Sequence, residues 1–168
     1  NGSRKLPNLT TLLALLLAQE GVPVLVHGPE HDPGRITTAE IFQTLGLPCA
    51  SDAADVHAAW QRREPVFILT EALCPPLAKL LDARRVIGLR NPAHTVAKLL
   101  APCRQGASVR VVNYTHPEYG SMLTQFLGRI GAHAMLLRGS LDVESEPGKG
   151  STFTVTLPVR LERRGGVR

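Results

Sequence analysis

The sequence has few aromatic residues and few cysteines. Only 4% of its 168 residues are Phe, Trp or Tyr, so aliphatic side chains must fill most of any core. Cys49, Cys74 and Cys103 are far apart and form no CxxC pair. This odd, scattered set argues against a disulfide framework and against a zinc site of ordinary spacing. We therefore expect buried structural thiols, a cytoplasmic protein and no metal held by protein ligands alone.

The sequence also lacks an apolar run long enough to cross a membrane. Residues 12–18 are all Leu or Ala and follow Arg4 and Lys5, an arrangement that imitates a signal peptide. The run is far shorter than the ~20 residues that a bilayer span requires. It ends in Gln19-Glu20-Gly21 and not in a small-residue cleavage site. We predict a buried helix over residues 8–20 and no membrane partner.

The charge balance is basic, with 19 Lys and Arg against 14 Asp and Glu, a formal net charge of +5. A basic excess of this size permits binding of nucleic acid or phosphate but does not require it. A basic surface that serves solubility alone is the alternative.

Apolar patterns alternate between short strands and longer helices. Strands are predicted over 22–26, 66–69, 109–113 and 134–137, and helices over 8–20, 37–46, 51–63, 92–100, 117–129 and from residue 75 onward. Thr37 and Glu40 form the sequence signature of a capping box, and Ser51 is a candidate cap of the following helix. This order predicts an α/β fold with a mostly parallel sheet and flanking helices.

Several side chains are assigned to the core from helical spacing. In the helix that begins at Pro75, the inward positions are predicted to be Leu77, Leu80 and Leu81. In the helix over 117–129 and just beyond it, they are predicted to be Leu123, Phe126, Leu127 and Ile130. Trp60 is predicted to pack in the core from its spacing to Val56.

The pattern changes after Gly139. Residues 141–146 and 152–157 alternate with period two on either side of Pro147-Gly148-Lys149-Gly150, which predicts a β-hairpin. Residues 159–168 form a basic, Gly-containing tail that we expect to be disordered. The predicted organisation is an α/β domain over 4–139, a hairpin over 140–158 and this tail.

Four short motifs follow one another within residues 4–139: Pro7-Asn8-Leu9-Thr10-Thr11, His27-Gly28, Gly88-Leu89-Arg90 and Thr115-His116-Pro117-Glu118. They give this segment a resemblance to the anthranilate phosphoribosyltransferases of glycosyltransferase family 3. It implies part of a phosphoribosyltransferase or nucleoside phosphorylase-like core. In the family, the Asn and hydroxyls at this helix start contact the phosphates of phosphoribosyl pyrophosphate, and an arginine matching Arg90 faces anthranilate. A helix N-terminus with short hydroxyls suits an anion.

The sequence departs from the enzyme pattern at positions that carry chemistry. Val26 replaces a phosphate-facing lysine, Pro29 replaces an asparagine, and Arg35-Ile36-Thr37-Thr38 replaces a Ser- and Gly-rich phosphate stretch. The Asp-Glu pair that helps to hold magnesium has no intact counterpart. These losses make the chain look more like the YbiB-like branch of the family. That resemblance implies a homodimer that lacks transferase activity and binds nucleic acid without sequence preference.

Eight residues are the candidate ligands of phosphate or nucleic acid, and none is predicted to be catalytic. They are Asn8, Thr10, Thr11, His27, Arg35, Thr38, Arg90 and Lys98. Six of the eight have a structural alternative. The residues from Asn8 to Thr11 are suited to cap a helix, and His27 to be a satisfied strand-end histidine. Arg90 is suited to pair with Asp82 or Glu71, and Lys98 to lie on a solvated helix face.

Residues 139–158 resemble the end of a sensor histidine kinase's ATP-binding domain. The family's Asn-bearing helix and its Asp-x-Gly-x-Gly loop are missing, so the resemblance implies no nucleotide site and no phosphotransfer. Three functions remain open for the whole chain. It is a non-catalytic domain that binds nucleic acid or a phosphate-bearing ligand, a magnesium-dependent phosphoribosyltransferase, or a chimera without function.

Overall fold

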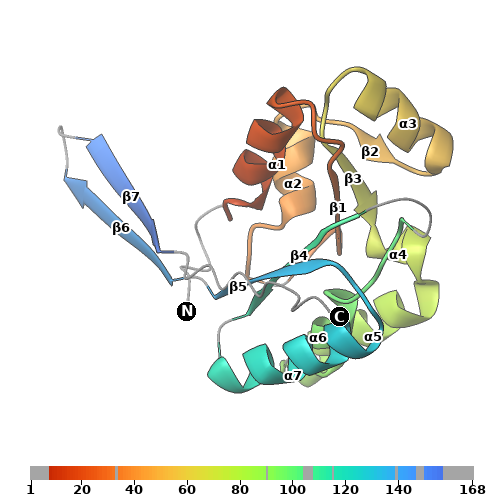
Figure 1. Cartoon of the computed structure of the whole chain (residues 1–168). Helices are drawn as coiled ribbons and strands as arrows, with labels where there is room; N and C mark the ends of the chain where they lie inside the picture. The colour runs from red at the N-terminus through yellow and green to blue at the C-terminus, as the bar shows by residue number, and fades with distance from the viewer. Residues whose placement is uncertain are drawn as a thin grey trace, which may run out of the picture. The chain divides into compact units, whose positions relative to one another are not determined.

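The structure is a computed structural model, and it describes residues 8–32, 34–89, 91–103, 108–114, 116–138, 140–146 and 150–156. The chain divides between Leu100 and Ala101 into two compact units, called the N-terminal unit and the C-terminal unit below. In both, parallel strands are accompanied by helices (Figure 1). The predicted α/β class with mostly parallel strands and a C-terminal hairpin is confirmed.

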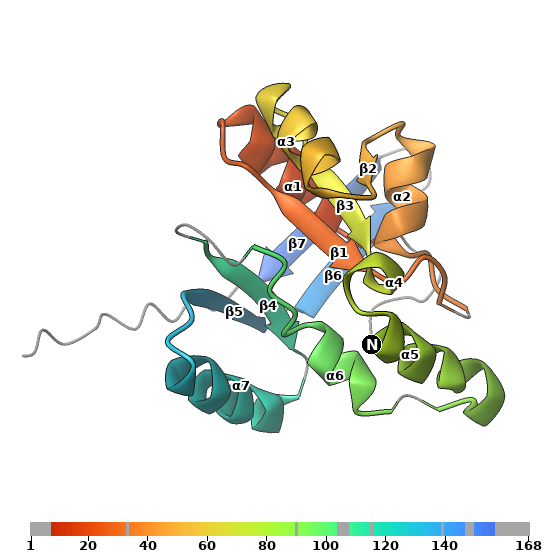
Figure 2. The ribbon, with the colours of Figure 1, turned by 90° about the vertical axis from the view of Figure 1, so that its right-hand side faces the viewer.

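A three-stranded parallel sheet organises the N-terminal unit. Its strands are β1 (Leu25–Gly28), β2 (Cys49–Ala50) and β3 (Val66–Leu69), in the order β1-β3-β2. The register pairs Gly28 with Leu69, so β1 and β3 end level with each other. The central strand β3 is almost entirely buried and apolar, as expected for a parallel strand covered on both faces. Figure 2 shows β1 and β3 side by side, with α4 and α5 beyond their ends.

Six helices accompany this sheet among the described residues. They are α1 (Thr10–Gln19), α2 (Thr38–Thr44), α3 (Ala53–Gln61), α4 (Thr70–Leu73), α5 (Pro75–Ile87) and α6 (Ala93–Ala97). The capping box at α2 is confirmed, because the Glu40 amide donates to Thr37 Oγ1 and the Thr37 amide donates to the Glu40 carboxylate. Helix α5 begins at two prolines and ends at Gly88, whose φ of 73° suits a residue without a side chain.

Two aromatic side chains organise the core of the N-terminal unit. Phe42 and Phe67 are fully buried, with ring centroids 5.4 Å apart, and they pack with Ala14 and Ala39. On the other side of the sheet, Trp60 packs beside Val66, and its indole N–H donates to a backbone carbonyl 3.1 Å away. Trp60 thus packs against the core, as predicted from its spacing, but is only partly buried.

Two local predictions about element boundaries were wrong. The first strand begins at Leu25 and not at Val22, because Pro23 has no N–H to donate to a ladder. Asp52, and not Ser51, caps α3, since its carboxylate accepts from two helix amides. The Ser51 hydroxyl donates instead to Asp55. The short elements β2 and α4 were not predicted.

Burial also differs from the prediction at several apolar positions. Helix α1 buries Thr11, Ala14 and Ala18, while its long side chains Leu12, Leu13 and Leu16 are 40–53% exposed. Leu80 is exposed although its neighbours Leu77 and Leu81 are buried. Small residues on the inner face let α1 approach α2 closely, and this leaves the leucines outside. Cys49 is exposed, and all three cysteines are free thiols.

The C-terminal unit contains a parallel β–α–β unit and a hairpin. Strand β4 (Arg110–Tyr114) pairs with β5 (Ala134–Arg138), and α7 (Pro117–Arg129) connects them. Leu123 and Leu127 of α7 are buried, but Phe126 and Ile130 are exposed, contrary to the prediction. Helix α7 covers the two strands with a single narrow row of side chains.

Strands β6 (Ser140–Glu146) and β7 (Gly150–Thr156) confirm the predicted hairpin. They pair antiparallel, with Leu141 opposite Val155. Of the predicted turn over 147–150, Gly150 is the first residue of β7, and residues 147–149 lie outside the described residues, as does the tail over 159–168. In the part of the chain that is described, no helix has the length and apolar character to span a bilayer.

Candidate functional site

A cavity of about 260 Å³ lies in the N-terminal unit at the carboxyl ends of β1 and β3. His27 and Gly28, at the end of β1, and Phe67 of β3 form its floor. Residues 29, 31, 32 and 35–37, between β1 and α2, form one wall, and residues of α5 and α6 form another. In open α/β sheets, ligands bind in this place beyond the carboxyl ends of the strands.

Five of the eight candidate residues line this one cavity although they are far apart in the sequence. They are Asn8, His27, Arg35, Thr38 and Lys98. The fold therefore brings an amide, a hydroxyl, an imidazole and two cations together. Their role in binding stays a prediction.

Asn8 connects the starts of α1 and α2 at the edge of the cavity. Its Nδ2 donates to Thr38 Oγ1 over 3.0 Å, and its Oδ1 lies 3.2 Å from the same hydroxyl. Asn8 Oδ1 also accepts from the Thr10 amide, which satisfies one amide of the first turn of α1. The capping role is thus present, and it coexists with a place in the cavity wall.

Two further candidates, Thr10 and Thr11, do not line the cavity. Thr10 is exposed on α1, and Thr11 is 3% exposed because it faces the core. Arg90 lies outside the described residues, so its predicted contact with an anion stays a prediction.

His27 is a neutral hydrogen-bonding group inside the cavity. Its Nδ1 is buried and has no hydrogen-bond partner among the described residues, which differs from the alternative of a satisfied histidine. Burial lowers the pKa of His27 below its ordinary value of 6.5. The imidazole is therefore neutral at pH 7, and its two ring nitrogens provide one donor and one acceptor.

This burial predicts how stability depends on pH. As the pH falls below 6.5, the unfolded chain protonates at His27 while the folded chain resists protonation, so the free energy of unfolding falls. His27→Gln removes this contribution, which has an upper limit of about 1.4 kcal/mol per pH unit. We expect denaturant titrations between pH 7 and pH 5 to give a shallower pH dependence for the variant. An unchanged slope would contradict a buried neutral imidazole, since the other five histidines are common to both proteins.

Both cations and carboxylates line the cavity. The cations are Arg35, Arg85 and Lys98, and the carboxylates are Asp32, Glu71 and Asp82. Arg85 pairs with Asp82 one helical turn away at 3.1 Å, and both side chains are more than half exposed. Asp32 pairs with Arg84 of α5 and, at 3.8 Å, with Arg35. The cations of the cavity can therefore bind an anion, but the carboxylates of the cavity compete with that anion for them.

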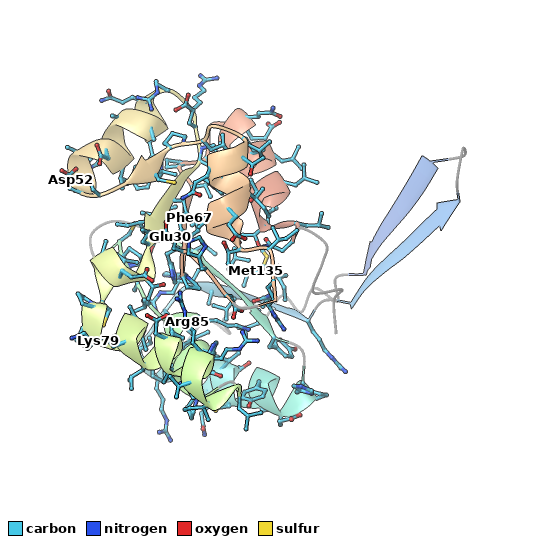
Figure 3. The ribbon with its side chains drawn as sticks, turned by 180° about the vertical axis from the view of Figure 1, so that it is seen from behind. Glu30, Asp52, Phe67, Lys79, Arg85 and Met135 are labelled. Atoms are coloured by element: carbon cyan, nitrogen blue, oxygen red, sulfur yellow. The ribbon has the colours of Figure 1, made fainter. Side chains whose placement is uncertain are left out.

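The sequence patterns did not identify the residues of α5 that line the cavity, and near α6 they identified only Lys98. On α5 the lining residues are Ala78, Leu81, Asp82 and Arg85. On α6 they are His94 and Ala97, followed by the C-cap residue Lys98. Positions i, i+3, i+4 and i+7 of a helix share one face, so the spacing of Arg85 from Ala78 was a usable signal. In Figure 3, Arg85 lies on the side of α5 toward the sheet, below Phe67, and Lys79 lies at its outer edge.

Within the described residues, no group of three or more His, Cys, Asp or Glu side chains is arranged to hold a metal ion. The cavity residues are thus suited to contacts with an anion through cations, an amide, a hydroxyl and a neutral imidazole.

Comparison with known proteins identifies relatives of most of the chain. No protein-family model matches it. The chain is 42% identical over 140 residues to the uncharacterized protein YbiB of Escherichia coli (strain K12), which covers 83% of the chain and 44% of YbiB. It is 27% identical to the anthranilate phosphoribosyltransferase of Methanosphaerula palustris over 79% of the chain and 39% of that protein. It is 29% identical to that of Thermus thermophilus over 80% of the chain and 40% of that protein.

The chain spans less than half the length of each of these relatives. The likeness of residues 139–158 to a histidine kinase stays a prediction. Over most of its length the chain is thus similar to YbiB and to anthranilate phosphoribosyltransferases.

Proposed function

We propose that the N-terminal unit binds the phosphate groups of nucleic acid, or of another phosphate-bearing ligand, and does no chemistry on them. The observation that carries the proposal is the convergence of Arg35, Arg85 and Lys98 on one cavity, beside the neutral His27. Guanidinium and ammonium groups form charge-assisted hydrogen bonds with phosphate oxygens, and these are among the stronger hydrogen bonds in proteins. The Asn8–Thr38 pair adds neutral donors at the rim.

The departures from the enzyme pattern support a binding role without catalysis. Val26 stands where the family resemblance expects a phosphate-facing lysine, and Pro29 stands where it expects an asparagine. Loss of a cation removes charge stabilisation from a transition state, whereas ground-state binding can draw on the cations that remain. Magnesium belongs to the proposal only if the chain is an enzyme.

Nucleic acid is the ligand that best fits the basic balance of the chain. Contacts to phosphate carry no sequence information, so we expect binding of single strands without sequence preference. The homodimer and the cytoplasmic location are further parts of the proposal. The family resemblance supports the homodimer, and the three free thiols support a reducing compartment.

The test is a titration of binding against salt. We expect a fluorescein-labelled single-stranded 20-mer to bind about 20-fold more weakly at 200 mM than at 50 mM NaCl, if three cations contact phosphates. Fluorescence anisotropy measures the affinity, and poly(dA) and poly(dT) test for sequence preference. An affinity that ignores ionic strength would exclude phosphate contacts as its source.

The second candidate function is phosphoribosyl transfer, which the similarity to anthranilate phosphoribosyltransferases favours. With phosphoribosyl pyrophosphate, Mg²⁺ and anthranilate, we expect no pyrophosphate release above that of a protein-free control. A coupled pyrophosphate assay measures the release. Turnover that scales with protein concentration and is abolished by EDTA would reverse the order of the two functions.

A further inference from the structure

Asp32 brings a carboxylate into the wall of the cavity that we propose for phosphate. Its side chain is 14% exposed, whereas that of Asp82, which also lines the cavity, is 64% exposed. A charge that is shielded from solvent acts on its neighbours with little screening. Asp32 is therefore the lining acid with the greater effect on an incoming anion.

The backbone holds this carboxylate against one of the proposed phosphate ligands. Gly34 has a φ of 72°, and the turn it allows lets the Arg35 amide donate to the Asp32 carbonyl over 3.0 Å. Asp32 and Arg35 form an isolated antiparallel bridge, and Arg35 Nε lies 3.8 Å from Asp32 Oδ2. The local backbone geometry thus holds the Asp32 carboxylate beside the Arg35 guanidinium.

A second cation reaches Asp32 from a distant part of the sequence. Arg84 of α5, 52 residues away and 12% exposed on its side chain, donates from Nη1 to Asp32 Oδ1. Arg84 does not line the cavity. Its contact draws the Asp32 carboxylate toward α5 and neutralises part of its charge.

We propose that Asp32 is a built-in competitor of the phosphate ligand and that Arg84 limits this competition. In the absence of ligand, the Asp32 carboxylate takes the place of a phosphate at Arg35. A bound phosphate must share Arg35 with Asp32 or displace it, and it is repelled by the same charge. Arg84 is a positioning residue that holds and compensates the carboxylate. This inference rests on the proposed function, because it assigns the residue that sets the affinity of that site.

Three substitutions that change the net charge equally test the competition. Asp32→Asn, Asp82→Asn and Glu64→Gln each remove one negative charge, and Glu64 lies outside the cavity in a surface pair with Arg62. With a 5′-phosphorylated single-stranded 20-mer at 50 mM NaCl, we expect Asp32→Asn to bind about tenfold more tightly. For Asp82→Asn, at an exposed position, we expect the affinity to rise about two- to threefold. For Glu64→Gln we expect only the small rise in affinity that any loss of one negative charge produces.

A second pair of variants tests the role of Arg84. We expect Arg84→Gln to weaken binding about fivefold, because the uncompensated carboxylate then holds Arg35 more strongly. Adding Asp32→Asn to Arg84→Gln is expected to restore at least wild-type affinity. A structural role of Arg84 alone would leave the double variant as weak as the single one. Thermal melts followed by Trp60 fluorescence verify that each variant folds.

The outcomes separate this inference from the proposed function. One outcome overturns the competitor role and leaves the phosphate site in place. In that outcome, binding by the wild type depends on salt and is weakened by Arg35→Gln, but the Asp32→Asn protein binds no more tightly than the Glu64→Gln protein. Failure of rescue by Asp32→Asn in the Arg84→Gln protein overturns the role of Arg84. If wild type and Asp32→Asn both fail to bind, the proposed function itself is overturned.

Discussion

Glutamine in place of both Arg85 and Lys98 is expected to weaken binding of single-stranded DNA about 100-fold at 50 mM NaCl. Both side chains line the cavity, from α5 and α6 respectively. A hydrogen bond to a charged group contributes about 1.5–3 kcal/mol, so the loss of two such contacts accounts for an effect of this size. The slope of log affinity against log salt is also expected to fall in magnitude by about 1.4, or 0.7 per lost contact to a single strand. Anisotropy titrations at four salt concentrations give both quantities.

The matched control removes two positive charges outside the cavity. Arg62 is part of an exposed pair with Glu64, and Lys79 lies on α5 away from the lining face (Figure 3). Arg62→Gln with Lys79→Gln changes the net charge by the same amount, so it reports the general electrostatic effect. If this control weakens binding as strongly as Arg85→Gln with Lys98→Gln, the basic surface as a whole binds the strand and the cavity does not.

Phe67→Ala is expected to lower the free energy of unfolding of the N-terminal unit by about 3–5 kcal/mol. Phe67 is fully buried on the central strand, contacts Phe42, and lines the cavity floor. Its removal leaves a void in the core that the paired strands on either side cannot close. The sequence contains one tryptophan, Trp60, which packs in the N-terminal unit, so its fluorescence in a urea titration reports this unit specifically.

Leu80→Ala is the control for this effect. Leu80 is 57% exposed on α5, so its truncation is expected to cost less than about 1 kcal/mol. Equal effects of the two substitutions would contradict the burial described here. A wild-type titration without a cooperative transition would favour the remaining alternative, a chimera without function.

Local signals in the sequence determined several elements correctly. The capping box of Thr37 and Glu40 marked the start of α2, because the two residues satisfy each other's amides whatever the rest of the fold does. Strand β3 and helix α7 were predicted with their observed bounds, since Pro117 opens the helix and a continuous apolar run forms the strand. The period-two pattern on either side of residues 147–149 predicted the hairpin in the same way.

Burial was predicted less well, because it depends on what each helix face meets. The leucines of α1 satisfy every sequence criterion for a core helix, but alanines contact α2 and leave Leu12 and Leu16 exposed. In α7, Leu123 and Leu127 are buried while Phe126 has the same spacing and is exposed. A pattern of apolar residues predicts which side chains can be buried. Which of them are buried depends on which part of the helix surface is covered by neighbouring elements.

The sequence by itself determined the fold class, the capped helices and the residue types suited to an anion. Only the tertiary structure decided which of those residues meet. Asn8 and Thr38 bond across 30 residues, and Asp32 and Arg84 pair across 52, contacts that no local pattern encodes. The physical reason is that loops and helices from distant parts of a chain lie next to one another at the carboxyl ends of parallel strands. The chemistry of each residue is therefore local, and the site is a property of the packing.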